Sequence, residues 1–305
     1  MYSRILIPLD GSKTAENVLP YARFLAERLK LPVEFLAVID LAAIATHGLG
    51  ENTRYLDEFM AEEERTSKAY LENIGETFSR SESRCTVITG KPEEMILQAA
   101  GADVRTLIAM ATHGRSGVRR WLLGSVTEKV LRATHNPLLL IRARSAADVE
   151  SDVTLKSVIV PLDGSSLAES ALPTVLDFAR ELALEVILLR AYGLPTGVVY
   201  GSEDYLPHHE ELLAGLREEA REYLNGKVAE LRSRELERLL PMVAEGSGAE
   251  EIIKAARDTP NSLVVMCTHG RSGVERWVLG SVTEKVVRHS GTPILVLRSQ
   301  QTNKG

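Results

Sequence analysis

The sequence predicts an α/β fold made of two tandem copies of a five-stranded, mainly parallel sheet with helices on both faces. Three observations predict it. Long blocks of sequence recur, short apolar runs have the character of buried strands, and helical segments separate those runs. Apolar strands that alternate with helices are typical of a parallel sheet covered on both faces. The length of 305 residues suits two domains of ordinary size.

The recurring blocks indicate a duplicated domain. The segment 8–12 (PLDGS) recurs at 161–165, and 112–132 matches 268–288 at all but three of 21 positions. So long a period is typical of repeated domains, not of solenoid units. We expect domain 1 at 1–143, a small and polar linker at 144–153, domain 2 at 154–298 and a C-terminal tail at 299–305.

Each copy is expected to contain five strands. In the first copy they are Arg4–Leu9, Val33–Ile39, Arg84–Thr89, Leu107–Ala111 and Pro137–Ala143, with Cys85 as a core residue. In the second they are Ser157–Leu162, Glu185–Ala191, Pro241–Glu245, Leu263–Cys267 and Pro293–Arg298.

Apolar residues spaced three and four apart predict helices between the strands. In the first copy these cover Ala15–Leu29, Tyr55–Phe78, Glu93–Ala100 and Ser125–Thr134, with a loop at 40–54. Pro20 and its counterpart Pro173 interrupt the first helix of each copy, and we expect a kink there.

Composition excludes several classes of partner. The net charge of −6 argues against nucleic acid or an anionic membrane as the main partner. No apolar run approaches the ~20 residues of a membrane-spanning helix. The first residues lead into a strand-like run instead of a signal peptide, and two cysteines make no disulfide framework. We therefore expect a cytoplasmic protein.

The segment after the fourth strand has the features of an anion-binding site. Gly114 and the pair Gly124–Ser125 lead from a strand into a helix, and arginines lie between them. Glycine lets a ligand approach the backbone, and a helix N-terminus presents N–H groups to an anion. A tight turn followed by a capped helix is the alternative interpretation.

Asp10 and Asp163 each follow the first strand of a copy. At that edge of a parallel sheet a carboxylate can accept hydrogen bonds from a ribose or an amino group. An aspartate that caps its own turn is the alternative. The aspartate recurs in both copies together with the glycine-rich segment, and this recurrence favours the binding role.

Together these motifs resemble the universal stress protein family in its tandem-domain form, over residues 1–143 and 154–298. The resemblance implies a Rossmann-like fold of the adenine nucleotide α-hydrolase type. The ATP-binding branch of that family carries Gly-x2-Gly-x9-Gly-Ser/Thr. The second and third glycines match Gly114 and Gly124, and in the second copy Gly270 and Gly280. Ala111 and Cys267 replace the first glycine.

The resemblance also implies a site in each copy. For domain 1 the ATP-binding residues are Pro8, Asp10, Val38, Gly114, Gly124, Ser125 and Val126. For domain 2 they are Pro161, Asp163, Ala191, Gly270, Gly280, Ser281 and Val282. Mg²⁺ or Mn²⁺ is expected to bridge the phosphates without a protein cage.

Three functions are weighed. The first is an ATP-binding stress-response regulator that acts through nucleotide-dependent conformation or an unknown protein partner, with at most slow hydrolysis. The second is an interaction scaffold with degenerate pockets, which Ala111 and Cys267 favour. The third is an ATP-consuming enzyme of a related superfamily. In the family resembled, single domains pair through the last strand, so we expect the two copies to pair in this way; a homo-oligomer is a further possibility.

Overall fold

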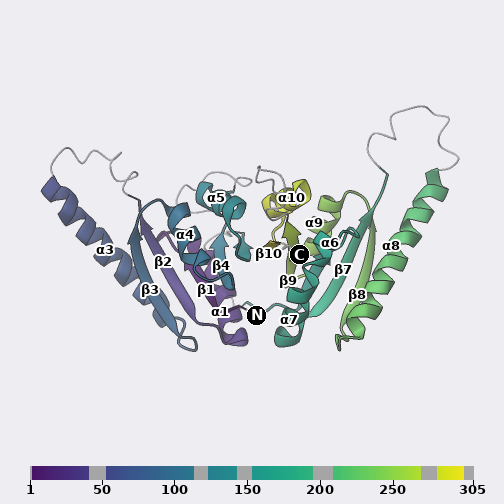
Figure 1. The fold of residues 1–305 in the computed structure, drawn as a ribbon, viewed down its shortest axis with the longest axis horizontal. Helices are drawn as coiled ribbons and strands as arrows, with labels where there is room; N and C mark the ends of the chain where they lie inside the picture. The colour runs from purple at the N-terminus through teal and green to yellow at the C-terminus, as the bar shows by residue number, and fades with distance from the viewer. Residues whose placement is uncertain are drawn as a thin grey trace, which may run out of the picture. The chain divides into compact units, whose positions relative to one another are not determined.

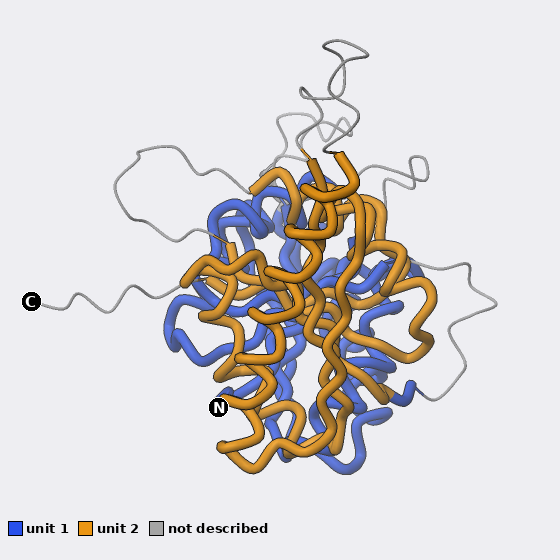
Figure 2. Tube along the Cα trace, turned by 90° about the vertical axis from the view of Figure 1, so that its right-hand side faces the viewer, with its two compact units in different colours: residues 1–154, 273–278 blue, residues 155–272, 279–305 orange. Residues whose placement is uncertain are grey.

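The structure is a computed structural model that describes residues 2–40, 53–112, 123–142, 153–194, 209–268 and 280–298. The chain divides into two compact units, residues 1–154 with 273–278 and residues 155–272 with 279–305 (Figure 2). We call them unit 1 and unit 2. The predicted linker, apart from Val153, and the predicted tail lie outside the described residues.

Unit 1 is a parallel five-stranded sheet with helices between its strands. The strand order is β3-β2-β1-β4-β5. Its strands are β1 (Arg4–Pro8), β2 (Val33–Ile39), β3 (Ser83–Thr89), β4 (Thr106–Ala111) and β5 (Leu138–Ile141). Its helices are a 3-10 helix η1 (Ala15–Val18), α1 (Leu19–Leu29), α3 (Thr53–Glu76), α4 (Pro92–Gly101) and α5 (Ser125–Ala133). All four strand pairs within the unit are parallel.

Unit 2 repeats this arrangement with strand order β10-β9-β6-β7-β8. Its strands are β6 (Ser157–Pro161), β7 (Glu185–Tyr192), β8 (Leu239–Glu245), β9 (Ser262–Thr268) and β10 (Ile294–Arg298). Its helices are α6 (Ser166–Glu169), α7 (Leu172–Leu182), α8 (His209–Arg232), α9 (Gly248–Asp258) and α10 (Ser281–His289). The predicted fold class is confirmed: each unit is a parallel α/β sheet.

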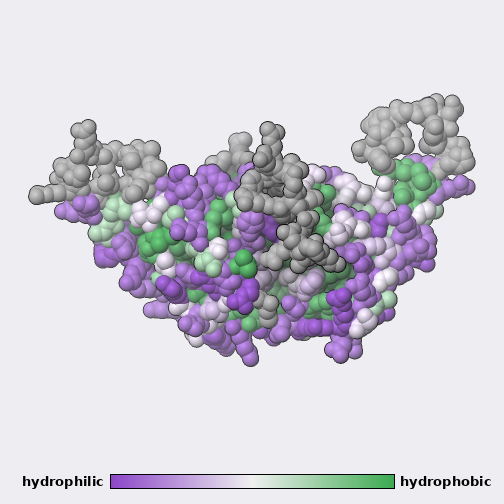
Figure 3. Space-filling view, in the orientation of Figure 1, coloured by the Kyte–Doolittle hydropathy of each residue, from purple (hydrophilic) through white to green (hydrophobic). Residues whose placement is uncertain are grey.

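Helices cover both faces of each sheet. In unit 1, α3 packs on β2 and β3, whereas α4 packs on β2 and β4 and contacts α5. Figure 1 shows α3 on one side of this sheet and α4 and α5 on the other. Ile5, Leu6 and Ile7 of β1 are fully buried between these layers. Hydrophilic side chains predominate on the face of the molecule drawn in Figure 3.

The structure divides the predicted helix at Ala15–Leu29 into two segments that meet next to Pro20. Pro20 lies in the first turn of α1, and the segment before it forms the separate 3-10 helix η1. Pro173 likewise begins α7 after the short helix α6. A proline lacks a backbone N–H, and a helix needs no internal acceptor for the N–H groups of its first turn. The residue therefore marks a boundary between two helices.

The burial of Cys85 also differs from the prediction of a core residue. Its strand, β3, is the edge strand of the unit 1 sheet, and Cys85 is only half-buried. The same edge position explains how β8, the edge strand of unit 2, accommodates Pro241, since an edge strand has one side without a ladder.

Candidate functional site

An aspartate turn follows the first strand of each unit. In unit 1, Oδ1 of Asp10 accepts hydrogen bonds from the backbone N of Ser12 at 3.0 Å and from its hydroxyl at 2.6 Å. In unit 2, Asp163 accepts the same two bonds from Ser165, at 2.9 and 2.6 Å. Both aspartates therefore cap their own turns, as the alternative interpretation expects. The turn holds each carboxylate in a defined place at the carboxyl edge of its sheet.

The glycine between aspartate and serine makes this turn possible. Gly11 has φ of 79° and Gly164 has φ of 89°, a region that other residues rarely adopt. The serine hydroxyl then accepts a hydrogen bond from the N–H three residues on, which begins the next helix. The Asp-Gly-Ser motif is thus a turn that ends in a helix cap.

In each unit a glutamate, buried in unit 1 and half-buried in unit 2, connects the helical turn that follows to the long helix of its unit. Tyr70 in α3 donates to Oε1 of Glu16 at 3.3 Å, and Tyr223 in α8 donates to Oε1 of Glu169 at 2.8 Å. Both pairs span 54 residues. We call them the Glu–Tyr clamps. Their recurrence at equal spacing is a signal that the sequence carries and that the sequence analysis missed.

Glycine-capped helices form the second part of the candidate site. Gly124 is the N-cap of α5 and Gly280 is the N-cap of α10, and neither provides a side-chain cap. The first N–H groups of a helix have no acceptor within it. Ser125 and Ser281 are exposed at these positions. The N–H groups and hydroxyls there form a potential anion-binding surface with the positive end of the helix dipole.

One side-chain and one backbone hydrogen bond keep this surface in place. The hydroxyl of Thr127 donates to the carbonyl of Ala111 at 3.0 Å, and Gly124 N donates to the carbonyl of Thr112 at 2.7 Å. Both bonds attach the start of α5 to the end of β4. The helix terminus is therefore fixed against the sheet before any ligand arrives.

The backbone at Gly280 does not itself require glycine. Its φ of −56° and ψ of 138° are open to any residue. A Cβ at this position would meet nothing closer than the Thr283 hydroxyl at 4.0 Å among the described residues. Glycine is itself an acceptable N-cap. Its presence here is also suited to close approach of a ligand to the helix N-terminus.

Sheet order brings the two parts together within each unit. In unit 1, β1 and β4 are neighbours, and η1 contacts β4. The chain leaves β1 toward β2 and leaves β4 toward β5, in opposite directions. This is the switch point at which open parallel sheets bind ligands. In unit 2, β6 and β9 are the corresponding pair, and α6 contacts β9.

The other predicted site residues fall into three groups. Pro8 and Pro161 are the last residues of β1 and β6, and Val38 and Ala191 lie near the ends of the neighbouring strands β2 and β7. Val126 and Val282 follow the serines in the first turns of α5 and α10. Gly114 and Gly270 lie outside the described residues. In each unit, the predicted ATP-binding residues that the structure describes thus belong to the carboxyl edge of the sheet.

The two units differ at the position of the first motif glycine. Ala111 ends β4 and is buried. Cys267 in β9 has its sulfur 3.1 Å from the hydroxyl of Ser170. That hydroxyl is also 2.6 Å from the carbonyl of Leu167, to which it donates. The Ser170 hydroxyl is the donor in both contacts and shares its one proton between the carbonyl and the sulfur.

Protonation of Cys267 is consistent with its surroundings. Burial raises the pKa of the Cys267 thiol above its usual value. The hydrogen bond from Ser170 lowers this pKa, but burial is the larger effect. The neutral thiol is a poor nucleophile. We therefore assign Cys267 a packing role beside the site.

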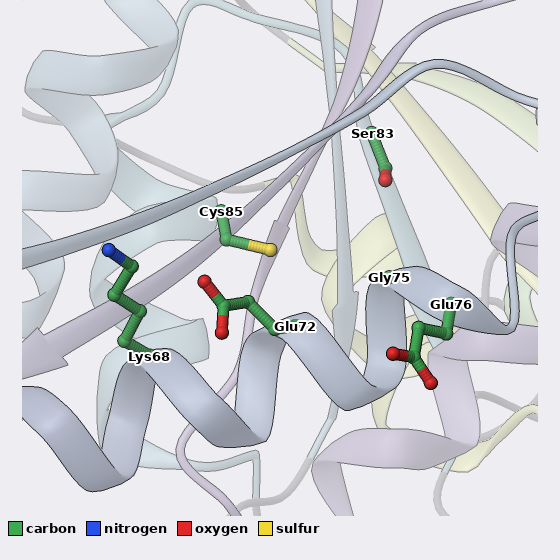
Figure 4. A pocket seen from close by; sticks show the side chains of 6 residues that line it. All are labelled: Lys68, Glu72, Gly75, Glu76, Ser83 and Cys85. Carbon is green, nitrogen blue, oxygen red and sulfur yellow. The ribbon is translucent and has the colours of Figure 1, made fainter.

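A polar groove lies apart from these residues, between α3 and β3. It is lined by Lys68, Glu72, Gly75, Glu76, Ser83 and Cys85 (Figure 4). A Cβ on Gly75 would lie 3.4 Å from the Ser83 hydroxyl, so this glycine lets the helix pack close to the strand. Burial, together with the charge of Glu72, raises the pKa of the Cys85 thiol. The raised pKa favours the protonated thiol of Cys85, which is the poorly nucleophilic form.

Comparison with known proteins identifies the family. The model of the universal stress protein family matches residues 1–142 and 154–298. The chain belongs to the universal stress protein family. Each unit contains one universal stress protein match, so the duplication seen in the sequence is a duplication of this domain.

Individual universal stress proteins resemble one half or the whole chain. Universal stress protein MJ0577 of Methanocaldococcus jannaschii is 30% identical over 161 residues, which cover 49% of this chain and 99% of that protein. A universal stress protein of Mycolicibacterium smegmatis is 23% identical over 308 residues, 96% of each chain. The crystal structure of one from Archaeoglobus fulgidus covers 98% of this chain and 99% of its own, with a TM-score of 0.71 and 21% identity.

Two further properties concern membranes and metals. None of the helices in the described part of the chain is both long and apolar enough to span a bilayer. Within the same residues, no three or more histidine, cysteine, aspartate and glutamate side chains gather as a metal site.

Proposed function

We propose that each unit binds one ATP molecule and that nucleotide binding alters the conformation of the chain or its affinity for a protein partner in a stress response. One observation carries the proposal. In each unit, an aspartate turn and a glycine-capped helix follow neighbouring parallel strands on the two sides of the sheet's switch point. Such edges bind nucleotides in α/β proteins.

Each part has a chemical role in this proposal. The carboxylates of Asp10 and Asp163 accept hydrogen bonds from the ribose hydroxyls. Backbone groups of Val38 and Ala191 meet the adenine edge. The first N–H groups of α5 and α10, with the hydroxyls of Ser125 and Ser281, bind the phosphates. The contribution of Gly114 and Gly270 is argued from the sequence alone.

A divalent cation accompanies ATP in this arrangement. Mg²⁺ retains several waters and is commonly held by substrate phosphates with one or two carboxylates. The residues at the glycine-capped helices supply hydroxyls and N–H groups, which suit phosphate oxygens and not a bare cation. The cation would therefore bridge the phosphates of the bound nucleotide.

Hydrolysis is expected to be slow. The carboxylate in the first turn of α5, Glu128, accepts hydrogen bonds from Arg132 at 3.2 and 2.9 Å. Glu284 in α10 is held by Arg288 in the same way. Each carboxylate oxygen that accepts from the arginine is less free to orient an attacking water. The arrangement suits retention of the nucleotide and a regulatory role.

Calorimetric titration with MgATP tests the proposal. The unaltered chain should bind two molecules, Gly124→Val and Gly280→Val should each bind one, and the double variant none. Gly226→Val is a matched control: Gly226 is an exposed residue of α8, and a Cβ there meets nothing within 4 Å. Absence of binding to the unaltered chain, with no thermal stabilisation by ATP, would reject nucleotide binding and favour the interaction scaffold.

A further inference from the structure

The outer edge of β3 can pair with a further strand. β3 is the end strand of the unit 1 sheet, and no other described strand pairs with it beyond β2. The ladder between β2 and β3 begins with a hydrogen bond of 2.8 Å from the N of Val33 to the carbonyl of Glu82. Because alternate residues of a strand direct their N–H and C=O groups to opposite sides, this bond fixes which residues of β3 face outward. The residues whose backbone groups point away from β2 are Ser83, Cys85, Val87 and Thr89.

This edge borders the polar groove between α3 and β3. Lys68 and Glu72 extend from α3 toward the strand that carries Cys85, and Glu76 lies one turn further along the helix (Figure 4). Helix residues four apart share one face, so Glu64 precedes these residues on the same face. All four charged side chains are exposed. With three carboxylates and one ammonium, this face of α3 is acidic.

The corresponding edge strand of unit 2 is interrupted. The ladder between β7 and β8 begins in the same way, with a hydrogen bond of 2.8 Å from the N of Val186 to the carbonyl of Arg238. In this register Pro241 occupies the place that Cys85 has in β3. Proline has no N–H to donate, and a proline on an edge strand discourages pairing with another chain.

The long helix of unit 2 also lacks the acidic face. The Glu–Tyr clamps align the two long helices, because Tyr223 has the place of Tyr70. The residues of α8 that correspond to the acidic face of α3 are exposed and are basic or uncharged: Arg217, Arg221, Asn225 and Ala229. An uninterrupted edge beside an acidic helix face is therefore a property of unit 1 and not of the duplicated domain in general.

The two faces of β3 differ in charge. Side chains along a strand project alternately to its two faces, so Arg84 lies on the face opposite to the polar groove. Arg84 is exposed, and its neighbour Thr86 donates a hydrogen bond to Oε1 of Glu34 at 3.0 Å. A strand added beside β3 would project its own side chains in the same alternation. Basic side chains on that strand suit the positions that face α3 and not the positions between them.

An unpaired strand edge binds an extended peptide by adding it to the sheet. We propose that the β3 edge of unit 1 binds an extended segment of a partner protein that carries lysine or arginine at alternate positions facing α3. Backbone hydrogen bonds to the outward groups of β3 provide affinity, and the carboxylates of Glu72 and Glu76 select the sequence. A second copy of the chain is disfavoured here, because antiparallel pairing of two β3 edges would bring two acidic helix faces together. The inference concerns a surface apart from the nucleotide site and does not depend on the proposed function.

Binding of a defined peptide to the full chain tests the inference. The probe is a fluorescent peptide as long as β3, blocked at both ends, in which lysine alternates with threonine, and its anisotropy measures binding. A peptide with glutamate in place of each lysine should bind at least about tenfold more weakly. Methylation of every second backbone nitrogen removes the N–H groups on one side of the peptide. One of the two methylated sets should lose about tenfold or more in affinity and the other should lose little, since only one side hydrogen-bonds to β3.

Charge reversal assigns the effect to the acidic helix face. The double variant Glu72→Lys with Glu76→Lys should weaken binding of the lysine probe by about tenfold or more. The matched control is Glu218→Lys with Glu222→Lys on α8. Both pairs are exposed and four residues apart, and both change the net charge by the same amount. The control should therefore bind the probe as the unaltered chain does.

Hydrogen exchange locates the bound peptide without any substitution. The probe should slow exchange of the outward amides of Cys85 and Val87. Exchange at Val243, which has the place of Val87 in β8, should stay unchanged. Cys85→Pro, which reproduces Pro241 in unit 1, should abolish binding while the amides of β1 keep the protection of the unaltered chain.

Each remaining outcome counts against the inference. If the lysine probe does not bind, or if it binds without protecting β3, the inference is wrong. Binding that both methylated sets retain is charge attraction alone and also overturns it. If the chain self-associates without peptide and thereby protects the same β3 amides, the occupant is a second copy and not a basic partner. None of these results alters the titration with MgATP, so failure here leaves the proposed function standing.

Discussion

Tyr223 donates a hydrogen bond of 2.8 Å from its hydroxyl to Oε1 of Glu169, across the 54 residues that separate α6 from the last turns of α8. The other oxygen of Glu169 lies 2.8 Å from the ammonium of Lys227. The short helix after the aspartate turn is thereby attached to the long helix of its unit. Tyr70 and Glu16 make the corresponding bond in unit 1.

We predict that Tyr223→Phe lowers the free energy of unfolding by about 1 kcal/mol, because it removes one hydrogen bond to a half-buried carboxylate. Tyr192→Phe is the matched control, since Tyr192 donates to Glu245 at 3.2 Å on the exposed surface, where the effect should be near zero. Urea denaturation measures both. Equal effects of the two variants would contradict a special role for the Glu–Tyr clamp.

The same pair predicts a pH dependence. Burial raises the pKa of Glu169, but hydrogen bonds from Lys227 and Tyr223 lower it below its usual value of 4.5. A carboxyl whose pKa is lower in the folded state stabilises the fold above its unfolded pKa, and this contribution is lost as the pH falls through the folded pKa. The difference in unfolding free energy between the unaltered chain and Glu169→Gln should therefore be constant near pH 7 and shrink below about pH 4.5. A difference that grows on acidification would contradict this assignment.

We predict that unit 1 binds ATP more tightly than unit 2. At the position of the first motif glycine, the methyl group of Ala111 is smaller than the thiol-bearing side chain of Cys267. Calorimetry on the Gly280→Val and Gly124→Val chains compares the two sites. Cys267→Ala in the latter should raise the affinity of unit 2 toward that of unit 1. The prediction fails if unit 2 binds ATP as tightly as unit 1 before that substitution.

We predict that Mg²⁺ or Mn²⁺ binds together with ATP and not alone. The cation would be held by phosphate oxygens, so removal of the nucleotide removes most of its ligands. Electron paramagnetic resonance of Mn²⁺ should report little protein-bound metal without ATP and a stoichiometric signal with it. Metal binding of comparable affinity in the absence of nucleotide would reject the bridging arrangement.

The last prediction concerns the last strands, β5 and β10. Each is apolar in sequence, and an exposed apolar edge strand promotes aggregation. We predict that the units pair with each other through these strands. Leu140→Glu or Val296→Glu should then loosen both halves, whereas Leu240→Glu, at a half-exposed position of β8, should not. Small-angle scattering that shows an elongated particle with independent domains would disprove the pairing.

Much of this molecule follows from local sequence. The repeated Pro-Leu-Asp-Gly-Ser segment predicts a strand that ends in a turn, because glycine supplies the positive φ and serine the helix cap. Apolar runs and helical spacing predict the order of strands and helices in both units. The glycine-serine pairs at 124–125 and 280–281 predict the helix starts that the structure shows.

Tertiary structure decided what depends on neighbours distant in the sequence. Whether Cys85 is core or edge depends on which strand takes the outer place in the sheet, which its own apolar run does not encode. Pro20 lies at the boundary between α1 and a separate 3-10 helix, η1, which contacts β4, and the apolar spacing of the segment does not encode this division. Glu169 meets Tyr223, and Arg190 reaches the turn at Gly164, only after the parallel register of β6 and β7 and the docking of α8 on β7 have brought those side chains together. Local propensity determines elements, whereas a site assembled from several elements is determined by the contacts between them.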